Sequence, residues 1–256
     1  MSALLLGGTA EARDLAARLV AADVEVVSSL AGDVAAPLLP AGKVRIGGFG
    51  GVHGLAGYLR ANAVSAVVDA THPFAATMTA HAAAACAVTG VALLRLERPS
   101  WAARPDAEHW HWVGSLDEAR GEAERLGERV FLAIGRQELG VFAGWTDRYV
   151  LARMVDAPGF APPATWEVVR ARGPFRLPDE LELLTSRAID VLVTKDSGGG
   201  TDAKLDAAAT LGVPVVAVRR PPPPEGIGVV SSVDEAVAWI VRRPGAATPW
   251  WWETHH

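Results

Sequence analysis

Two glycines near the start of the chain stand between an apolar run and a helix-forming stretch, which is the arrangement of an anion-binding turn. Residues 4–6 are the apolar run, Gly7 and Gly8 the turn, and Thr9 begins the predicted helix. The free N–H groups and the dipole at a helix N-terminus attract phosphate. The dinucleotide fingerprint G-x-G-x-x-G/A is met in part, since Gly7 and Ala12 fill its outer positions and Thr9 replaces its middle glycine. The spacing favours nucleotide binding, with a purely structural turn as the alternative.

The end of the second predicted strand indicates which nicotinamide cofactor fits. An NAD site places Asp or Glu about 20 residues after the glycines, where the carboxylate binds the ribose 2′-hydroxyl. This chain has Val27, Ser28 and Ser29 there and no carboxylate. The serines are able to hydrogen-bond a 2′-phosphate, and Arg13 or Arg45 adds positive charge if it lies close. The sequence therefore favours NADPH over NADH.

A third loop, DATHPFAATM, begins at Asp69 directly after the predicted strand 66–68. It is expected at the carboxyl edge of the same sheet, where open α/β folds bind ligands. Pro73 fixes the turn, and Thr71 and His72 offer polar groups beside it. His72 fits three roles: a general acid, a hydrogen-bond donor to a cofactor, or a cap for its own helix.

The stretch TKDSGGGTDAKLDAA repeats this layout in the second half of the chain. The predicted strand 191–194 runs through Lys195 and Ser197 into the glycines 198–200, ahead of a helix that carries Lys204. Successive N–H groups in a glycine turn form an anion-binding nest, to which the lysines add charge. The spacing of a Walker loop is missing.

A companion loop, AIGRQELG, leaves another predicted strand through a glycine and presents Arg136 and Gln137. With the glycine nest, it predicts a site for a polyanionic ligand in the second half. His109 and His111 have the spacing of a metal-binding pair on a strand, but no further ligand lies nearby in the sequence, so no metal is expected. Neither a nucleophile elbow nor a pair of catalytic carboxylates supports hydrolysis.

The elements that hold these loops follow from the hydrophobic pattern. Apolar runs rich in Val, Leu and Ile recur at residues 3–6, 24–28, 66–68, 91–96, 129–134, 149–155, 191–194 and 213–218. Continuous hydrophobicity is typical of strands that are covered on both faces. Helical stretches lie between most of them, at residues 10–21, 52–60, 75–89, 115–126, 201–211 and 233–242, with Ser115 and Ser232 as caps. The alternation predicts βαβ units.

Two domains of similar size fit the pattern better than one. Residues 98–113, RPSWAARPDAEHWHWV, interrupt the alternation with prolines, aromatics and charge. The sequence therefore predicts an α/β protein with two Rossmann-like domains of parallel strands and an interdomain cleft. Residues 1–112 are the expected NADP-binding domain with its connecting segment, and residues 113–256 the expected substrate-binding domain. Residues 156–175 predict a loop, and PPPPEG predicts a stiff surface turn.

Composition narrows the class of protein. No apolar run reaches the roughly 18 residues of a bilayer span, and no basic segment precedes the first run, so neither a membrane protein nor a secretory signal is expected. The single cysteine, Cys86, excludes an internal disulfide and fits the cytoplasm. A formal charge of −5 argues against nucleic-acid binding. Arginines nevertheless cluster at residues 95–104 and 170–176, either as solvated faces or to grip carboxylate or phosphate.

Five motifs together resemble one family. LLLGGTAEA at the N-terminus, DATHPFA at residue 69, RLERPSW at residue 95, IGRQ at residue 134 and TKDSGGGTDAKLDAA at residue 194 are similar to the precorrin-6A reductase family of cobalamin biosynthesis. The resemblance covers nearly the whole chain. It implies an NADPH-dependent oxidoreductase that delivers hydride to a macrocycle double bond, converting precorrin-6A to precorrin-6B, with the ring between two Rossmann-like domains.

The resemblance and the loop positions give a set of expected site residues. Cofactor binding is assigned to Gly7, Gly8, Thr9, Glu11, Ser28, Ser29, Thr71 and His72, and substrate binding to Arg136, Lys195, Ser197, Gly198 and Gly199. The cations and the glycine nest suit the acetate and propionate carboxylates of the ring. The nicotinamide supplies the hydride. The catalytic proton donor stays open among His72, Lys195, Asp196, bulk water and the substrate's own carboxylates.

Two alternatives remain for the function. One is an NADP-dependent reductase of another polyanionic substrate, because the fold fits it equally well. The other is a non-catalytic sensor of the NADP redox state that reports to a partner through its second domain. A preformed polyanion nest favours an enzyme, since a sensor has little use for it.

Overall fold

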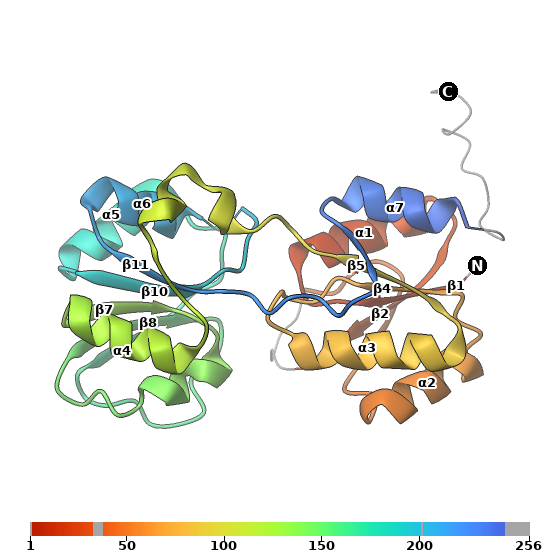
Figure 1. Ribbon diagram of the computed structural model, residues 1–256, viewed down its shortest axis with the longest axis horizontal. Coiled ribbons are helices and arrows are strands. Elements are labelled where there is room, and N and C mark those ends of the chain that lie inside the picture. The colour runs from red at the N-terminus through yellow and green to blue at the C-terminus, as the bar shows by residue number, and fades with distance from the viewer. Residues whose placement is uncertain (1, 33–37, 201, 244–256) are drawn as a thin grey trace. The chain divides into compact units, whose positions relative to one another are not determined.

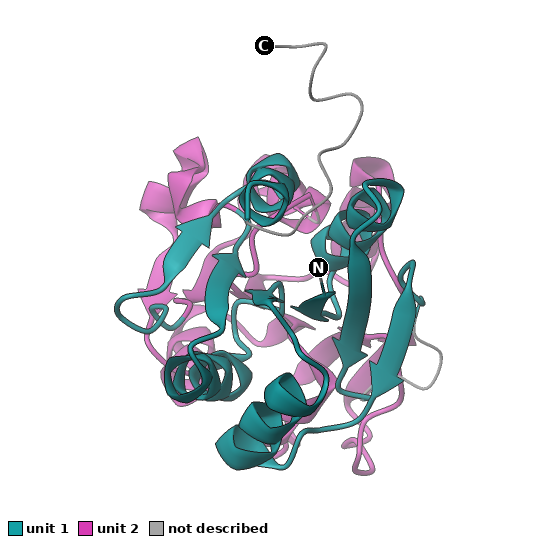
Figure 2. Cartoon of the chain, turned by 90° about the vertical axis from the view of Figure 1, so that its right-hand side faces the viewer, with its two compact units in different colours: residues 1–98, 221–256 teal, residues 99–220 magenta. Residues whose placement is uncertain are grey.

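Two compact units make up the chain in the computed structural model, which describes residues 2–32, 38–200 and 202–243. Met1–Arg98 and Pro221–His256 form unit 1, and Pro99–Arg220 forms unit 2 (Figure 2). Each unit has one six-stranded sheet in which all neighbouring strands are parallel. The predicted α/β class with two Rossmann-like halves is confirmed. In the described part of the chain, no helix has the length and apolar character that a membrane crossing requires.

Unit 1 orders its strands β12-β5-β4-β1-β2-β3. Its elements are β1 (Ser2–Leu6), α1 (Ala10–Ala21), β2 (Glu25–Leu30), β3 (Lys43–Ile46), α2 (Gly51–Ala61), β4 (Ala66–Asp69), α3 (Ala76–Thr89), β5 (Ala92–Leu96), β12 (Gly228–Val230) and α7 (Val233–Val241). Helices α1 and α7 cover one face of the sheet, and α2 and α3 cover the other (Figure 1). Covering both faces explains why successive residues of β1, such as Leu4 and Leu5, are fully buried. Cys86 of α3 lies in the second of these cores, and burial raises the pKa of its thiol to about 11.

Unit 2 orders its strands β6-β11-β10-β7-β8-β9. Its strands and α-helices are β6 (His111–Val113), α4 (Leu116–Leu126), β7 (Arg129–Ala133), β8 (Tyr149–Met154), β9 (Trp166–Arg170), α5 (Leu177–Ser186), β10 (Val191–Lys195), α6 (Ala203–Leu211) and β11 (Val215–Val218), and its 3₁₀ helices are η1 (Trp101–Ala103), η2 (Pro105–His109) and η3 (Arg136–Phe142). Leu184 of α5 and Leu205 of α6 pack with Phe131 and Leu192 on one face. Helix α4 packs against β10, β11 and η3 on the other (Figure 1).

The chain passes between the units twice, at residues 98/99 and 220/221. After unit 2, β12 pairs with β5 and α7 packs against α1, so residues 221–243 complete unit 1. This division differs from the predicted boundary between residues 112 and 113. Residues 99–112 belong to unit 2, and the end of the described chain returns to unit 1. Strands β5 and β12 are far apart in the sequence, so no local sequence pattern predicts that they pair.

Four strands lie outside the predicted apolar runs, and all four are edge strands: β3 and β12 in unit 1, β6 and β9 in unit 2. An edge strand has one neighbour instead of two and carries polar residues, such as Arg45 in β3 and Glu167 in β9. Strand β9 replaces part of the loop predicted for residues 156–175, and α5 lies outside the predicted helices although it starts with a proline and two acidic residues. Thr201, the predicted start of a helix, lies outside the described residues, and α6 begins at Ala203.

The two predicted helix caps are confirmed. The Ser115 hydroxyl accepts a hydrogen bond from the Glu118 N–H at 3.1 Å at the start of α4. The Ser232 hydroxyl accepts from the Glu235 N–H at 3.3 Å, and the Glu235 carboxylate accepts in return from the Ser232 N–H at 3.0 Å. These reciprocal bonds satisfy two helix donors at once.

One arginine is completely buried at the carboxyl ends of β4 and β5. Arg95 is 1% exposed, and its Nη1 donates to Asp69 Oδ2 at 2.6 Å and to the hydroxyls of Thr71 and Thr79 at 3.1 and 3.0 Å. Its Nε donates to Glu97 at 2.9 Å. Asp69 also accepts from the Thr71 N–H and hydroxyl, at 3.1 and 2.7 Å. Arg95 thus neither faces solvent nor binds a ligand carboxylate or phosphate. Its hydrogen bonds and ion pairs fix the loop that follows β4.

Replacing Arg95 measures how much this network contributes to the free energy of unfolding. Arg95→Met leaves the Asp69 carboxylate buried without its cation and is expected to cost about 3–5 kcal/mol of unfolding free energy. Asp69→Asn is expected to cost less, because Arg95 keeps Glu97. The double variant should recover part of the loss of Arg95→Met. Urea unfolding followed by circular dichroism measures all three, and a double variant as unstable as Arg95→Met would mean that packing, not charge, is responsible.

Helix α2 brings Gly54 against the chain that precedes the helix. A Cβ at Gly54 would lie 1.7 Å from the Phe49 carbonyl oxygen, whereas a Cβ at Gly57 of the same helix meets nothing within 4 Å. The Phe49 ring in turn lies under the guanidinium of Arg45, 3.7 Å from ring centroid to Cζ. The close approach at Gly54 therefore sets the position of a ring that supports an arginine at the sheet edge.

Alanine at these two glycines should have opposite effects on stability. Gly54→Ala forces the backbone at Phe49 to move, at a cost of roughly 1–3 kcal/mol. Gly57→Ala, the matched control, removes glycine flexibility from open helix and should stabilise by about 0.5–1 kcal/mol. Thermal unfolding compares the two. An unchanged melting temperature for Gly54→Ala would show that the Phe49 carbonyl is not a fixed neighbour.

Candidate functional site

The carboxyl ends of the strands in unit 1 bring several predicted residues to one edge of the sheet. From β1 the chain moves to β2 and β3 on one side, and later to β4 on the other. Open α/β folds bind ligands at such a reversal. The loops that follow β1 and β4 are joined there, because Thr9 Oγ1 donates to the Ala70 carbonyl at 2.9 Å.

The glycine turn after β1 is tied to β2 and opens into α1. The Gly7 N–H donates to the Ser29 carbonyl at 2.9 Å, and Gly8 has a φ of +118°, which few other residues adopt. Thr9 caps α1 by accepting from the Ala12 N–H at 3.1 Å. The N–H groups and dipole at this helix start favour an anion. Glu11 lies in the same first turn, where Arg98 Nη1 approaches its carboxylate at 3.4 Å and offsets its charge.

The loop after β4 holds Thr71 and His72 beside this turn. Thr71 is fixed by the Asp69–Arg95 network described above. His72 Nδ1 accepts from the Phe74 N–H at 3.2 Å, so a neutral His72 carries its proton on Nε2. The N-cap of α3 is Ala75, without a side-chain hydrogen bond. His72 therefore braces its own turn and does not cap the helix, and its Nε2 is a hydrogen-bond donor.

Ser28 and Ser29 do not act as a pair, because successive residues of a strand point to opposite faces. The Ser28 hydroxyl is buried and has no hydrogen-bond partner among the described residues. The Ser29 hydroxyl accepts from Arg45 Nη1 at 2.7 Å. The structure thus joins Arg45, rather than Arg13 of α1, to the end of β2.

Arg45 is held in place without an acidic partner. Besides Ser29, it donates to the carbonyls of Gly47 and Gly48 at 2.8 and 3.0 Å, and its guanidinium lies over Phe49. Among the described residues no carboxylate pairs with it. An arginine fixed at the carboxyl edge with its charge uncompensated suits an anionic ligand.

Unit 2 reverses its strand order between β7 and β10, and the two loops found there are AIGRQELG and TKDSGGG. They are joined by an ion pair of 2.5 Å between Lys195 Nζ and Glu138 Oε1. A Cβ at Gly135 would lie 2.5 Å from the other oxygen of Glu138, so a glycine leaves room for this carboxylate. Arg136 begins η3 at the same edge. Glu138 was missed from the sequence, although it stands two positions after Arg136 in a motif already singled out.

The glycine-rich loop itself turns sharply. The Ser197 N–H donates to the Lys195 carbonyl at 2.6 Å, and Gly198 and Gly199 have φ values of +65° and +74°. Glycine adopts such φ values readily, which explains the residue type at both positions. Lys204 does not extend this loop as an exposed cation: its side chain is buried, with Nζ 4.3 Å from the centroid of the Trp101 ring.

Asp196 lies at the start of this loop, and its carboxylate is surrounded by hydrogen-bond donors of the protein. The residue is 3% exposed, and its carboxylate accepts a hydrogen bond from Arg220 Nε at 3.0 Å. Ser100 and Trp101 donate to it as well. Of the two adjacent arginines 219 and 220, Arg220 is half-buried and pairs with Asp196, whereas Arg219 is exposed.

The two histidines with metal-like spacing separate in the fold. His109 ends η2 with an exposed ring, and His111 in β6 lies 2.7 Å from Glu122 through Nδ1. Within residues 2–32, 38–200 and 202–243, no three His, Cys, Asp or Glu residues gather in a way that would hold a metal ion. Glu122 also pairs with Arg125 at 3.0 Å, which makes this a surface ion network.

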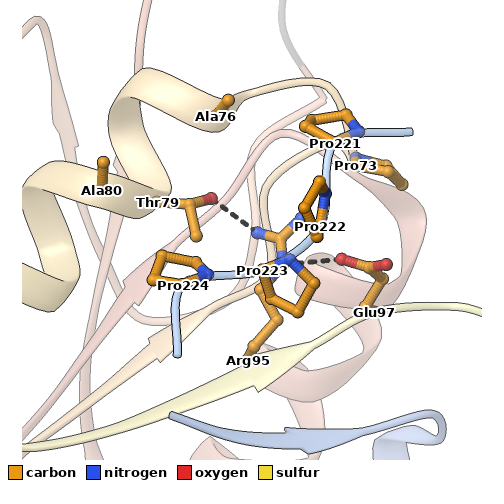
Figure 3. A pocket seen from close by; sticks show the side chains of 10 residues that line it. All are labelled: Pro73, Ala76, Thr79, Ala80, Arg95, Glu97, Pro221, Pro222, Pro223 and Pro224. Atoms are coloured by element: carbon orange, nitrogen blue, oxygen red, sulfur yellow. Dashed lines mark hydrogen bonds and ion pairs between the residues drawn. The ribbon is translucent and has the colours of Figure 1, made fainter. Parts of the chain in front are cut away.

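A small pocket of about 210 Å³ lies in unit 1 behind the loop after β4. Pro73, the first turns of α3, Arg95 and Glu97 form its walls, and residues 221–224 run across it (Figure 3). The prolines predicted to form a surface turn therefore also wall a pocket. Its polar atoms belong to the Arg95 network, and the rest of its lining is proline and alanine.

Comparison with known proteins agrees with this architecture. Residues 2–241 match the family described as "Precorrin-6x reductase CbiJ/CobK". The chain is 52% identical over 239 residues to a precorrin-6A reductase of Rhodococcus erythropolis, covering 93% of this chain and 96% of that protein. It is 50% identical over 243 residues to a precorrin-6A reductase of Mycobacterium tuberculosis H37Rv, covering 94% and 98%.

A relative named cobalt-precorrin-6A reductase, from Salmonella typhimurium, is 30% identical over 240 residues, covering 86% of this chain and 88% of that protein. A solved structure titled "CobK precorrin-6A reductase" superimposes with a TM-score of 0.88 at 43% identity, covering 98% of this chain and 99% of that one. Both the sequence and the fold are thus shared over almost the full length. The chain belongs to the precorrin-6x reductase family of oxidoreductases.

Proposed function

We propose that this chain reduces a double bond of precorrin-6A with NADPH, giving precorrin-6B in cobalamin biosynthesis. The observation that carries the proposal is the identity of about half of all residues, over more than nine tenths of both chains, with proteins named precorrin-6A reductase. Loops at both reversal edges support it, since they supply the groups that the two ligands require. The reaction is assigned to the cytoplasm, which fits a chain with a single buried cysteine.

The metal-free ring is the proposed substrate. Relatives named precorrin-6A reductase are 44–52% identical to this chain, whereas those named cobalt-precorrin-6A reductase are 30–32% identical. The nearer group therefore supports a substrate without cobalt.

Unit 1 is the proposed NADPH-binding unit. The first turn of α1 with Gly7, Gly8 and Thr9 suits the pyrophosphate, and Thr71 and His72 lie on the adjoining loop. At the end of β2, Arg45 without an acidic partner suits a 2′-phosphate, while Ser29 orients its guanidinium. When bound, the nicotinamide supplies the hydride. Ser28, with its hydroxyl sealed in the core, has no role in this proposal.

Unit 2 is the proposed substrate-binding unit. Arg136, Lys195, Ser197 and the N–H groups of Gly198 and Gly199 lie on its reversal edge and suit the carboxylates of the ring. Lys195 is oriented by Glu138. For the proton that completes the reduction, the proposed sources are His72, Lys195 and Asp196, with bulk water and the substrate's own carboxylates as alternatives.

Cofactor preference tests the role of Arg45. Arg45→Gln should raise the KM for NADPH on the order of tenfold to a hundredfold, because a charge-assisted contact with the 2′-phosphate is lost, and leave the weaker use of NADH unchanged. Arg45→Lys keeps the charge but loses the fork and should be intermediate. Lys43→Gln removes a cation from the exposed start of the same strand and should match the wild type. Equal losses with NADPH and NADH would assign Arg45 to the scaffold.

Turnover tests the function itself. NADPH oxidation is followed by absorbance under anaerobic conditions with purified precorrin-6A and, separately, with its cobalt-containing counterpart. Fast oxidation with the metal-free ring, slow oxidation with the cobalt ring and slower use of NADH are expected. Faster turnover of the cobalt ring would overturn the assignment of the substrate. NADPH binding without oxidation in either case would contradict the reductase and favour a sensor.

A further inference from the structure

Three exposed arginines stand close together where the chain leaves β9: Arg170, Arg172 and Arg176. Residues 170–176 are called the arginine segment below. Because every strand of the sheet is parallel, this segment leaves the same carboxyl edge as the loops after β7 and β10. In the strand order β10-β7-β8-β9, β9 lies two strands from β7, about 10 Å at the usual strand spacing. The arginine segment is therefore a neighbour of the proposed substrate loops within unit 2.

A buried ion pair holds the helix that follows the arginine segment. Arg153, near the carboxyl end of β8, donates through Nη2 to Glu180 Oε2 at 3.0 Å and through Nη1 to Glu180 Oε1. The two side chains are 8% and 2% exposed. Glu180 lies in the first turn of α5, which begins at Leu177, directly after the segment. The bidentate pair thus joins β8 to the helix at the far end of the segment.

Stacking attaches the arginine segment itself to the same guanidinium. Arg153 Cζ lies 3.7 Å from the centroid of the Phe175 ring and 4.9 Å from that of Phe131, a fully buried residue of β7. A guanidinium is attracted to aromatic faces in this arrangement. At the start of the segment, the Ala171 N–H donates to the Met154 carbonyl at 2.9 Å. Both ends of the segment are therefore fixed to β8.

A buried ion pair is by itself a poor source of stability, because two charges lose their hydration and apolar side chains of similar volume serve a core equally well. What an arginine provides is a fixed geometry, since its planar fork binds a carboxylate and stacks on a ring at once. Here that geometry holds a cluster of cations at the edge of the sheet. Arg176 is paired with Asp179 at 2.9 Å, whereas Arg170 forms no ion pair with any residue that the structure describes.

We propose that the arginine segment is a further anion-binding site of unit 2, which takes an acetate or propionate carboxylate of the substrate through Arg170 and Arg172, and that Arg153 is the positioning residue that holds it. The inference rests on the proposed function in one respect, namely that the carboxylate belongs to the ring. Arg153 is enclosed by two aromatic rings and a helix, so it acts through the segment. Arg170 and Arg172 add to the cations at this edge, Arg136 and Lys195.

Replacing the two cations tests the site. The double variant Arg170→Gln/Arg172→Gln should raise the KM for precorrin-6A about tenfold, because charge-assisted contacts with a carboxylate are lost, and should leave kcat and the affinity for NADPH unchanged. Its kcat/KM should also depend less on salt concentration. Arg125→Gln, the control, removes an exposed arginine from the last turn of α4 and should match the wild type. A double variant with the KM of the wild type would overturn the site.

A second double variant tests the positioning role. Arg153→Met/Glu180→Leu removes both buried charges together, so neither is left without its partner, and urea unfolding should show a stability close to that of the wild type. Its KM for precorrin-6A should nevertheless rise as in Arg170→Gln/Arg172→Gln, with kcat unchanged. Combining all four changes should add little, because they act on one segment. An unchanged KM would refute the role of Arg153. Phe175→Leu, which frees the segment but keeps the buried pair, takes the place of this variant if it does not fold.

Hydrogen exchange tests the positioning role without any substrate. In Arg153→Met/Glu180→Leu, the amides of residues 171–173, 175 and 176 should exchange faster than in the wild type, while the amides of β10 should keep their protection. Unchanged exchange at Ala171, whose N–H bonds to β8, would show that Arg153 does not restrain the segment.

A ring that is not turned over separates the site from the proposed function. Uroporphyrin is a tetrapyrrole with acetate and propionate groups, and its binding in the absence of NADPH is followed by the quenching of tryptophan fluorescence. Its affinity should fall about tenfold in Arg170→Gln/Arg172→Gln. Equal affinities of this variant and the wild type would overturn the site. A wild-type protein that binds uroporphyrin but oxidises no NADPH with precorrin-6A would contradict the proposed function alone.

Discussion

Parallel pairing of every strand is the constraint on which the rest of the structure depends. When all strands of a sheet run the same way, all of their carboxyl ends meet at one edge, and the loops that leave them are gathered there whatever their distance in the sequence. Each unit reverses its strand order once, between β1 and β4 in unit 1 and between β7 and β10 in unit 2, and the two loops on either side of the reversal leave the same edge. At each reversal a polar contact locks two loops together: Thr9 with Ala70 in unit 1, and Lys195 with Glu138 in unit 2.

Arginine is used in opposite ways in this acidic chain. Arg95 is fully buried and its charge is offset by Asp69 and Glu97, so it organises a loop from within the core. Arg220 of unit 2 is half-buried, and its charge is offset by Asp196. Arg45 is held by a hydroxyl, two carbonyls and an aromatic ring, none of which offsets its charge. The first two arginines have acidic partners, whereas the third has none among the described residues and is the one proposed to bind a ligand.

The return of the chain to unit 1 adds a second constraint. Because β12 extends the first sheet and α7 packs beside α1, unit 2 is an insertion between β5 and β12 and is held at both of its ends. Ser100 and Arg220 at these ends are half-buried and bond to Asp196 on one side of the boundary, and the prolines 221–224 line a pocket with Arg95 on the other. Segments that look like linkers in the sequence are thus parts of two folded cores. Their contacts, not their length, fix where each unit begins.

The sequence by itself determined the fold class, the central strands, six of the seven α-helices assigned in the described chain, two helix caps and the glycine-containing loops at the carboxyl edges, because these depend on local hydrophobic runs, cap residues and glycines. Tertiary structure alone decided the rest. The four edge strands lack a continuous apolar run, since a strand with one neighbour is only partly buried. Side-chain roles were decided by partners distant in the chain: Arg95 by Asp69, Asp196 by Ser100 and Arg220, and Ser29 by Arg45. A residue type shows which contacts are possible, but burial and the charges around it select the one that forms.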